Sequence, residues 1–138
     1  MTKIKVDHVA VVVADMDAAL GFWRDALGLP LEGTEHNEQE AVDIAFLPAG
    51  ESRIELLLPT DTESGIARYL EKRGAGMHHI CFAVPAIEDA LEQLRGHDIE
   101  LINDQPRTRE DGTRYAFVHP RSTGGVLVEL YETPEETA

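Results

Sequence analysis

The chain has 138 residues, which is enough for one domain with a buried core. Its 12 Lys and Arg side chains against 26 Asp and Glu side chains give a formal net charge of −14. That charge argues against a nucleic-acid backbone or an anionic membrane surface as the partner. A single cysteine, Cys81, excludes an internal disulfide, and no apolar run approaches the ~18 residues of a membrane span. We therefore expect a cytoplasmic protein.

The first half of the chain predicts a β-α-β-β-β module. Residues 6–13 are mostly apolar and rich in β-branched side chains, as in a strand covered on both faces. Residues 16–27 carry apolar side chains at helical spacing, with Asp15 as a cap before them and Gly28 after them. We expect one face of this helix to pack inward, including its last residue, Leu27. Strands are then predicted at residues 29–34, 41–47 and 53–58, with the polar run 35–40 as a connection.

The second half repeats this order after a connecting helix within residues 59–76. His79 stands 71 residues after His8 (79 − 8 = 71), and the same kinds of residue follow each histidine. The pattern predicts a strand at 79–84, a helix at 87–94 and strands at 100–102, 115–119 and 126–131. The predicted fold class is thus α+β, with one domain over residues 1–138. It comprises two tandem βαβββ modules at about 4–58 and 77–132 and an acidic tail at 133–138.

Two histidines and two glutamates hold equivalent places in the two modules. His8 and His79 each open an apolar strand, and Glu55 and Glu129 each interrupt the last apolar strand of their module. A buried, ionised carboxylate is costly unless it is paired, hydrogen-bonded or bound to a metal. A lone strand histidine is more often structural and a lone strand glutamate is usually exposed, but their repetition favours one divalent-cation site with nitrogen and oxygen ligands. Four other histidines are interpreted as surface or structural residues: His36, His78, His97 and His119.

The sequence resembles the vicinal oxygen chelate superfamily (glyoxalase, bleomycin resistance protein and dioxygenase) and, within it, the methylmalonyl-CoA epimerase family. The segments that carry the resemblance are residues 6–11, 54–60 with 66–67, 76–80 and 119–130. The resemblance implies paired modules whose mixed sheet curls around a metal-centred cavity, usually in a homodimer. It also implies that one divalent metal ion, cobalt before nickel, manganese or zinc, is held by His8, Glu55, His79 and Glu129.

The resemblance further implies an isomerase that interconverts (2R)- and (2S)-methylmalonyl-CoA by abstracting the C2 proton through a metal-stabilised enolate. Such a reaction needs one acid-base group on each face of the planar intermediate. Glu129 matches one of the family's two catalytic glutamates. The other position falls on Gln39 in an ungapped alignment, with Glu38 and Glu40 on either side. We favour Glu38 as the second catalytic residue, which requires a one-residue bulge that turns it inward.

Two alternatives stay open at this point: a glyoxalase-I-like isomerase of a glutathione hemithioacetal, and a non-catalytic small-molecule-binding protein of the same fold. An acyl-CoA thioester substrate is polyanionic, so its binding requires a locally basic surface on this acidic protein. Two groups of basic residues could supply it. They are Arg107, Arg109, Arg114 and Arg121 in the second module, and Arg68, Lys72 and Arg73 in the connecting helix.

Overall fold

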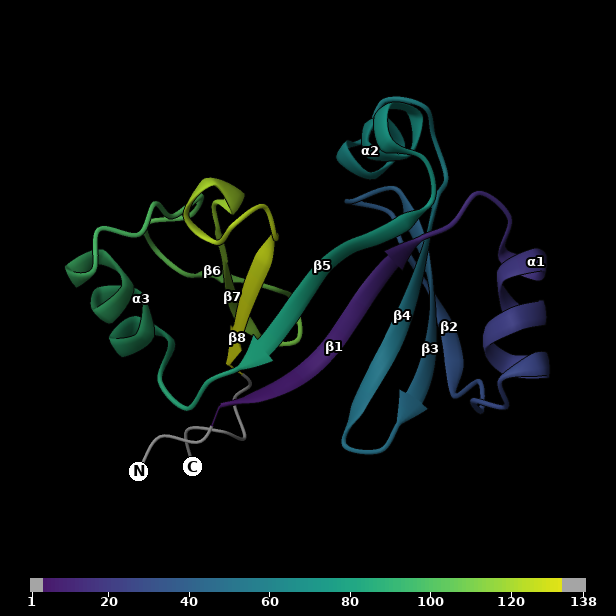
Figure 1. Ribbon diagram of the computed structural model, residues 1–138, viewed down its shortest axis with the longest axis horizontal. Helices are drawn as coiled ribbons and strands as arrows, with labels where there is room; N and C mark the ends of the chain where they lie inside the picture. Colours follow the sequence, from purple (N-terminus) through teal and green to yellow (C-terminus); the bar gives the residue numbers. More distant parts are fainter. Residues whose placement is uncertain (1–3, 133–138) are drawn as a thin grey trace. The chain divides into compact units, whose positions relative to one another are not determined.

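The computed structural model describes residues 4–132, so the predicted acidic tail lies outside the described residues. Two βαβββ modules follow one another within that range, joined by one helix (Figure 1). The α+β class and the tandem modules are therefore confirmed. The first module contains β1 (Lys5–Val12), α1 (Met16–Leu20), the π-helix η1 (Gly21–Ala26), β2 (Gly33–Asn37), β3 (Val42–Ala49) and β4 (Ser52–Pro59). The connecting helix is α2 (Gly65–Arg73), and the second module contains β5 (Gly76–Ala83), α3 (Ile87–Gly96), β6 (Arg107–Thr108), β7 (Arg114–Val118), the 3-10 helix η2 (Pro120–Ser122) and β8 (Val128–Glu132).

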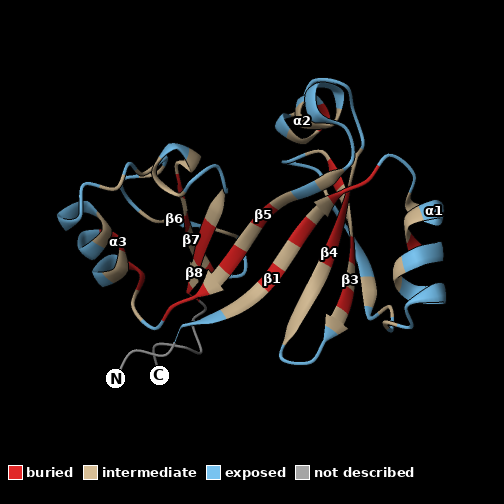
Figure 2. Cartoon of the chain, in the orientation of Figure 1, coloured by how far each residue is buried: buried red, intermediate tan, exposed pale blue. Residues whose placement is uncertain are grey.

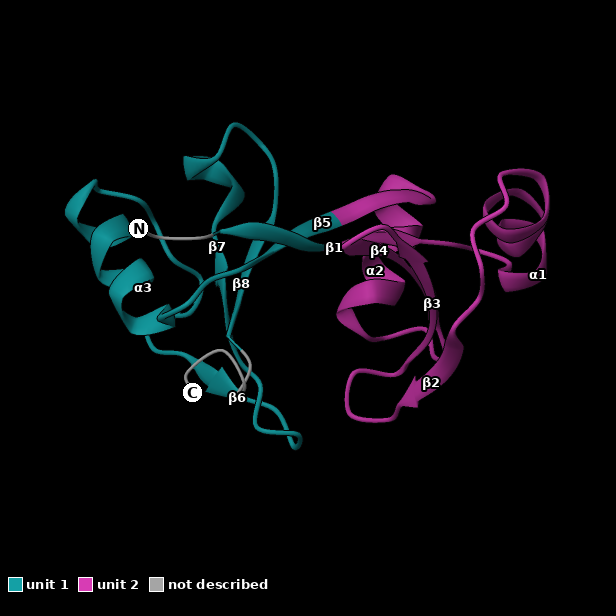
Figure 3. Ribbon diagram, turned by 90° about the horizontal axis from the view of Figure 1, so that it is seen from below, with its two compact units in different colours: residues 1–7, 79–138 teal, residues 8–78 magenta. Residues whose placement is uncertain are grey.

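The chain folds as two compact units, and it passes from one to the other inside β1 and inside β5 (Figure 3). One unit runs from His8 to His78, and the other contains, of the described residues, 4–7 and 79–132. Both histidines of the predicted metal site are therefore the first residue after a crossing. None of the helices in residues 4–132 is long and apolar enough to span a membrane.

The unit His8–His78 has its strands in the order β2-β3-β4-β1, with β1 parallel to β4 and the other pairs antiparallel. Helices cover both faces of this sheet. Leu20 of α1 packs with Leu47 and Leu56 on one face. Tyr69 and Leu70 of α2 pack with a second cluster on the opposite face, which contains Val12, Val42 and Leu57. Because side chains alternate along a strand, neighbouring Leu56 and Leu57 serve different faces.

The predicted helix at residues 16–27 changes type part-way. Asp15 caps α1 as expected, with its Oδ1 accepting from the Ala18 amide at 3.1 Å. The chain then continues as η1, where the Leu27 amide donates to the Phe22 carbonyl at 2.8 Å, five residues back. The wider π turn rotates the following residues away from the direction that α-helical spacing implies. The prediction that Leu27 packs inward is therefore wrong, since Leu27 is 54% exposed.

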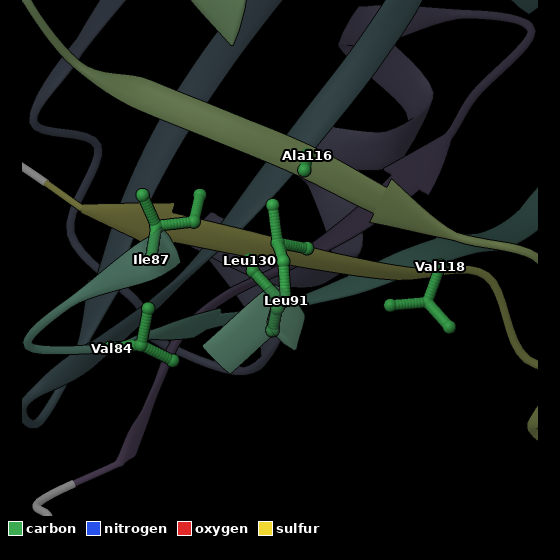
Figure 4. Close-up of a cluster of buried hydrophobic side chains, with 6 residues drawn as sticks. All are labelled: Val84, Ile87, Leu91, Ala116, Val118 and Leu130. Atoms are coloured by element: carbon green, nitrogen blue, oxygen red, sulfur yellow. The ribbon is translucent and has the colours of Figure 1, made fainter. Parts of the chain in front are cut away.

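The other unit has its strands in the order β5-β8-β7-β6, with β5 parallel to β8. Helix α3 covers one face of this sheet through Ile87 and Leu91, which are fully buried (Figure 4). Two strand predictions for this unit are wrong, as is the one that placed a strand at residues 29–34, since β2 lies at Gly33–Asn37. Of the segment at 100–102, Leu101 alone forms an isolated bridge to Val118, and β6 lies instead at Arg107–Thr108, where no strand was predicted.

Helix α3 is capped from a distant part of the chain. Its N-cap residue, Ala86, has no side chain that can accept a hydrogen bond. The buried Glu132 of β8 supplies the acceptor instead, since its Oε2 accepts from the Ile87 amide at 2.7 Å. The other carboxylate oxygen lies 3.5 Å from Nη1 of Arg114. One side chain thus satisfies one amide at the start of α3 and links the helix to the last strand.

Candidate active site

The two histidine-bearing strands have the same burial pattern. In β1, the side chains of His8, Ala10 and Val12 are buried, and the residues between them are partly exposed (Figure 2). In β5, His79, Cys81 and Ala83 follow the same alternation. Each histidine thus opens a strand face whose next side chains are small: alanine and valine in β1, cysteine and alanine in β5. Small neighbours leave room beside the imidazoles, and helix α3 packs on the opposite face of β5.

In the unit His8–His78, a histidine, a glutamate and an arginine converge. His8 Nδ1 lies 3.3 Å from Oε2 of Glu55, and Nε of Arg53 donates to the same oxygen at 3.1 Å. Glu55 is 7% exposed, so its charge needs these partners. The Arg53 guanidinium lies 5.0 Å from the ring centre of Phe46, which stands directly opposite Glu55 in the β3–β4 register.

The other unit contains a corresponding cluster. His79 Nε2 lies 3.1 Å from Oε1 of Glu129, and Nη2 of Arg109 donates to Oε2 at 3.1 Å. Glu129 is 1% exposed. Phe117 stands opposite Glu129 in the β7–β8 register and makes an edge-on contact with the His79 ring. The Arg109 guanidinium lies 3.8 Å from the ring centre of Tyr115, a close cation–π contact.

A tight turn holds the backbone of Arg109. The Arg109 amide donates to the Thr113 carbonyl at 2.8 Å, and the Gly112 amide donates to the Arg109 carbonyl at 3.0 Å. Asp111 accepts from the Thr113 amide at 2.9 Å. Hydrogen bonds from Thr113 hold the pKa of the Asp111 carboxyl below its ordinary value, with a smaller contribution from the charge of Arg109. The turn therefore presents Arg109 from a fixed backbone.

All four predicted ligands lie on the strands predicted for them, but the sequence did not indicate that two arginines contact the glutamates. Arg53 received no role, and Arg109 was assigned only to a basic region. The two arginines come from different elements, β4 and the β6–β7 turn, so they do not align in the repeat. One signal was available for the aromatic residues, since Phe46 and Phe117 are 71 residues apart (117 − 46 = 71).

The acidic run before β3 forms a turn. Glu38, Gln39 and Glu40 are all exposed and connect β2 to β3, so the predicted strand bulge is not present at this place. Ala41 closes the turn in the left-handed region, with φ of 53°, which is unfavourable for a residue with a Cβ. The catalytic role of Glu38 stays a prediction, and it now depends on the turn's conformation.

The remaining histidines have the surface or structural contacts that were predicted. His36 pairs with Asp43 at 2.7 Å across β2 and β3, and His97 is exposed beyond α3. His78 contacts the ring of Tyr69, and His119 accepts from the Arg121 amide at the start of η2. Besides Arg109, two more arginines of the predicted basic group have acidic partners: Arg114 pairs with Glu88 and Glu132, and Arg121 pairs with Glu100.

Comparison with known proteins identifies the family. The Glyoxalase/Bleomycin resistance protein/Dioxygenase superfamily matches residues 7–117. The chain belongs to this superfamily. A closely similar solved structure is that of a hypothetical protein from Bacillus halodurans C-125, with a TM-score of 0.91, 40% identity and 99% of both chains covered.

Methylmalonyl-CoA epimerases are among the relatives within the superfamily. The mitochondrial enzyme of Mus musculus is 36% identical over 127 residues, which cover 91% of this chain and 71% of that protein. A variant of the Streptomyces coelicolor epimerase, in complex with 2-nitronate-propionyl-CoA, has a TM-score of 0.82 and 32% identity, with 94% of both chains covered. The resemblance to this family is confirmed.

Proposed function

We propose that this chain is an isomerase that epimerises methylmalonyl-CoA at C2, with a divalent metal ion held by His8, Glu55, His79 and Glu129. The observation that carries the proposal is the repeated pair of a buried histidine and a buried glutamate, one pair on equivalent strands of each module. The kinship with methylmalonyl-CoA epimerases supports the choice of reaction and of an acyl-CoA thioester as substrate.

The donor set fits a divalent ion. Two ligand atoms ~2.1 Å from an ion and at right angles to each other are about 3.0 Å apart. The nitrogen-to-oxygen distances of 3.3 Å in the His8–Glu55 pair and 3.1 Å in the His79–Glu129 pair are close to this value. That all four residues share one ion is part of the proposal. When bound, the ion supplies a positive charge for the thioester oxygen, where negative charge develops as the C2 proton leaves.

The protein's own residues move the proton. Glu129 is proposed as the acid-base group on one face of C2, and burial excludes water from its carboxylate. Glu38 is proposed as the group on the opposite face. Its position in an exposed turn means that the turn must close over the substrate before Glu38 can act. We do not assign this role to Gln39, because its side-chain amide is neither an acid nor a base near neutral pH.

Proton exchange at C2 tests the proposal. Incubation of metal-loaded protein with (2R)-methylmalonyl-CoA in D2O is expected to give deuterium at C2 together with the (2S) epimer. A glutathione hemithioacetal serves as the competing substrate for a glyoxalase-type activity. Turnover of the hemithioacetal without exchange at C2 would reject the epimerase. Binding of small molecules without turnover of either substrate would favour a non-catalytic role.

The stoichiometry of the metal tests the shared site. One ion per chain is expected for wild type, and substitution of either His8 or His79 by alanine should abolish tight binding. Two ions per chain, each lost separately in one variant, would show instead that each pair binds its own ion. Light scattering of the same samples checks the predicted homodimer.

A further inference from the structure

We infer that Arg109 is a positioning residue that fixes how Glu129 is offered to the metal, so that Oε1 acts as the ligand while Oε2 stays held by the guanidinium. This inference rests on the proposed metal site. It goes beyond it by assigning a separate task to each oxygen of one carboxylate and by giving a role to a residue outside the predicted ligand set.

The division of contacts on Glu129 carries the argument. Oε1 lies beside the histidine nitrogen, 3.1 Å from His79 Nε2, and Oε2 accepts from Arg109 Nη2 at the same distance. A carboxylate can bind an ion through one oxygen or through both. A guanidinium that occupies Oε2 opposes the two-oxygen mode, both because the hydrogen bond would break and because its charge repels the ion.

Arg109 is restrained enough to perform this task. Its guanidinium lies 3.8 Å from the Tyr115 ring centre, and its backbone is tied to Thr113 in the turn. Its side chain is 31% exposed, whereas that of Glu129 is 2% exposed, so solvent reaches part of the arginine but hardly any of the carboxylate. Because the Arg109 side chain is held at its backbone and against the Tyr115 ring, its guanidinium can contact Oε2 in only a narrow range of positions.

The first module provides an internal comparison. Arg53 and His8 both approach the same oxygen of Glu55, Oε2. Arg53 therefore competes with the ion for that oxygen, or the ion must take Oε1. The separation of contacts in the His79–Glu129 pair is thus a specific property of the second module and does not follow from the repeat.

Cobalt(II) alone is the probe for the test, because its visible spectrum responds to the number and arrangement of its ligands. The variants are Arg109→Met and Arg109→Lys, with Arg95→Met as a matched control. Arg95 is an exposed arginine of the same unit, and it donates to the Asp104 carbonyl. Its replacement by methionine changes the net charge by the same amount as Arg109→Met does. Thermal unfolding of each variant shows whether it is folded, and if Arg109→Met is not, Arg109→Lys carries the comparison.

We expect Arg109→Met to change the cobalt spectrum and to lower kcat by about 10- to 100-fold, a typical effect of removing a residue that orients a metal ligand. KM for the acyl-CoA should change by less than about threefold in Arg109→Met. The kcat of Arg109→Lys should lie between those of wild type and Arg109→Met, and the kcat of Arg95→Met should match that of wild type. An unchanged spectrum, or a rise in KM with kcat retained, would overturn the inference. If wild type shows no exchange at C2, the proposed function fails, yet the spectra still decide whether Arg109 positions Glu129.

Discussion

Substitution of Glu132 tests whether one carboxylate of β8 caps helix α3. Glu132→Ala removes the acceptor of the Ile87 amide, which lies 2.7 Å from Oε2, and leaves that N–H group buried without its partner. A hydrogen bond to a charged group is worth about 1.5–3 kcal/mol. The neighbouring Arg114 also loses a contact, so we expect a loss of about 3 kcal/mol in the free energy of unfolding. Glu132→Gln keeps an acceptor without the charge and should lose about 1 kcal/mol.

Urea unfolding followed by circular dichroism measures these losses. With a slope of about 2 kcal/mol per molar urea, a loss of 3 kcal/mol moves the midpoint by about 1.5 M. The control is Glu88→Ala, since Glu88 also pairs with Arg114, at 3.1 Å, but its side chain is 72% exposed. That exposed pair should contribute less than about 1 kcal/mol. A midpoint of Glu132→Ala equal to that of Glu88→Ala would refute the capping role.

Four further outcomes are expected. Glu38→Gln should lower the rate of C2 proton exchange by about 100- to 10,000-fold, as removal of an acid-base group does, whereas Glu40→Gln should change it little. Deuterium incorporation measures both rates, and equal rates in the two variants would exclude Glu38 as the acid-base group. A saturating divalent ion should raise the unfolding temperature of wild type but not of His79→Ala, which differential scanning calorimetry can check. Because the pKa of Asp111 is lowered in the folded state, its contribution to stability is present above its unfolded pKa and is lost as the pH falls through the folded pKa. The difference in urea midpoint between wild type and Asp111→Ala should therefore shrink towards pH 3. A difference independent of pH would contradict this. Ser64→Ala should cost about 1 kcal/mol in urea unfolding, because it removes the oxygen that accepts from the Ala67 amide at the start of α2.

The order of helices and strands along the chain, and the placement of the four predicted ligands on apolar strands, could be predicted because both depend on local pattern. Alternation along β1 and β5 fixes which side chains turn inward, so the burial of His8 and His79 follows from their neighbours. The same logic placed Glu55 and Glu129 on buried strands. A run of apolar residues with one charge in it is a strong signal, because a buried charge requires compensation.

Features that depend on hydrogen bonds between distant residues, or on departures from regular geometry, could not be predicted. The π-helix at η1 has the composition of an ordinary amphipathic helix, and spacing alone does not show that the bonds shift from four residues to five. Strand β6 has two residues, too few for a period to appear. The cap of α3 by Glu132 joins residues 45 positions apart, so no local capping signature exists.

The two modules repeat the ligands but differ in how an arginine meets each glutamate, and this difference bears on the reaction. One histidine and one glutamate from each module can serve equally as ligands of an ion. Epimerisation needs something less symmetric from Glu129, which is proposed both to hold the ion and to move a proton, and one oxygen cannot serve both tasks at once. In the second module the contacts on the two oxygens are already separate, with His79 on Oε1 and Arg109 on Oε2, whereas in the first module His8 and Arg53 meet on one oxygen. If both residues act as proposed, Glu129 is the glutamate whose two oxygens have different partners, and Glu55 is the one expected to serve as a ligand only.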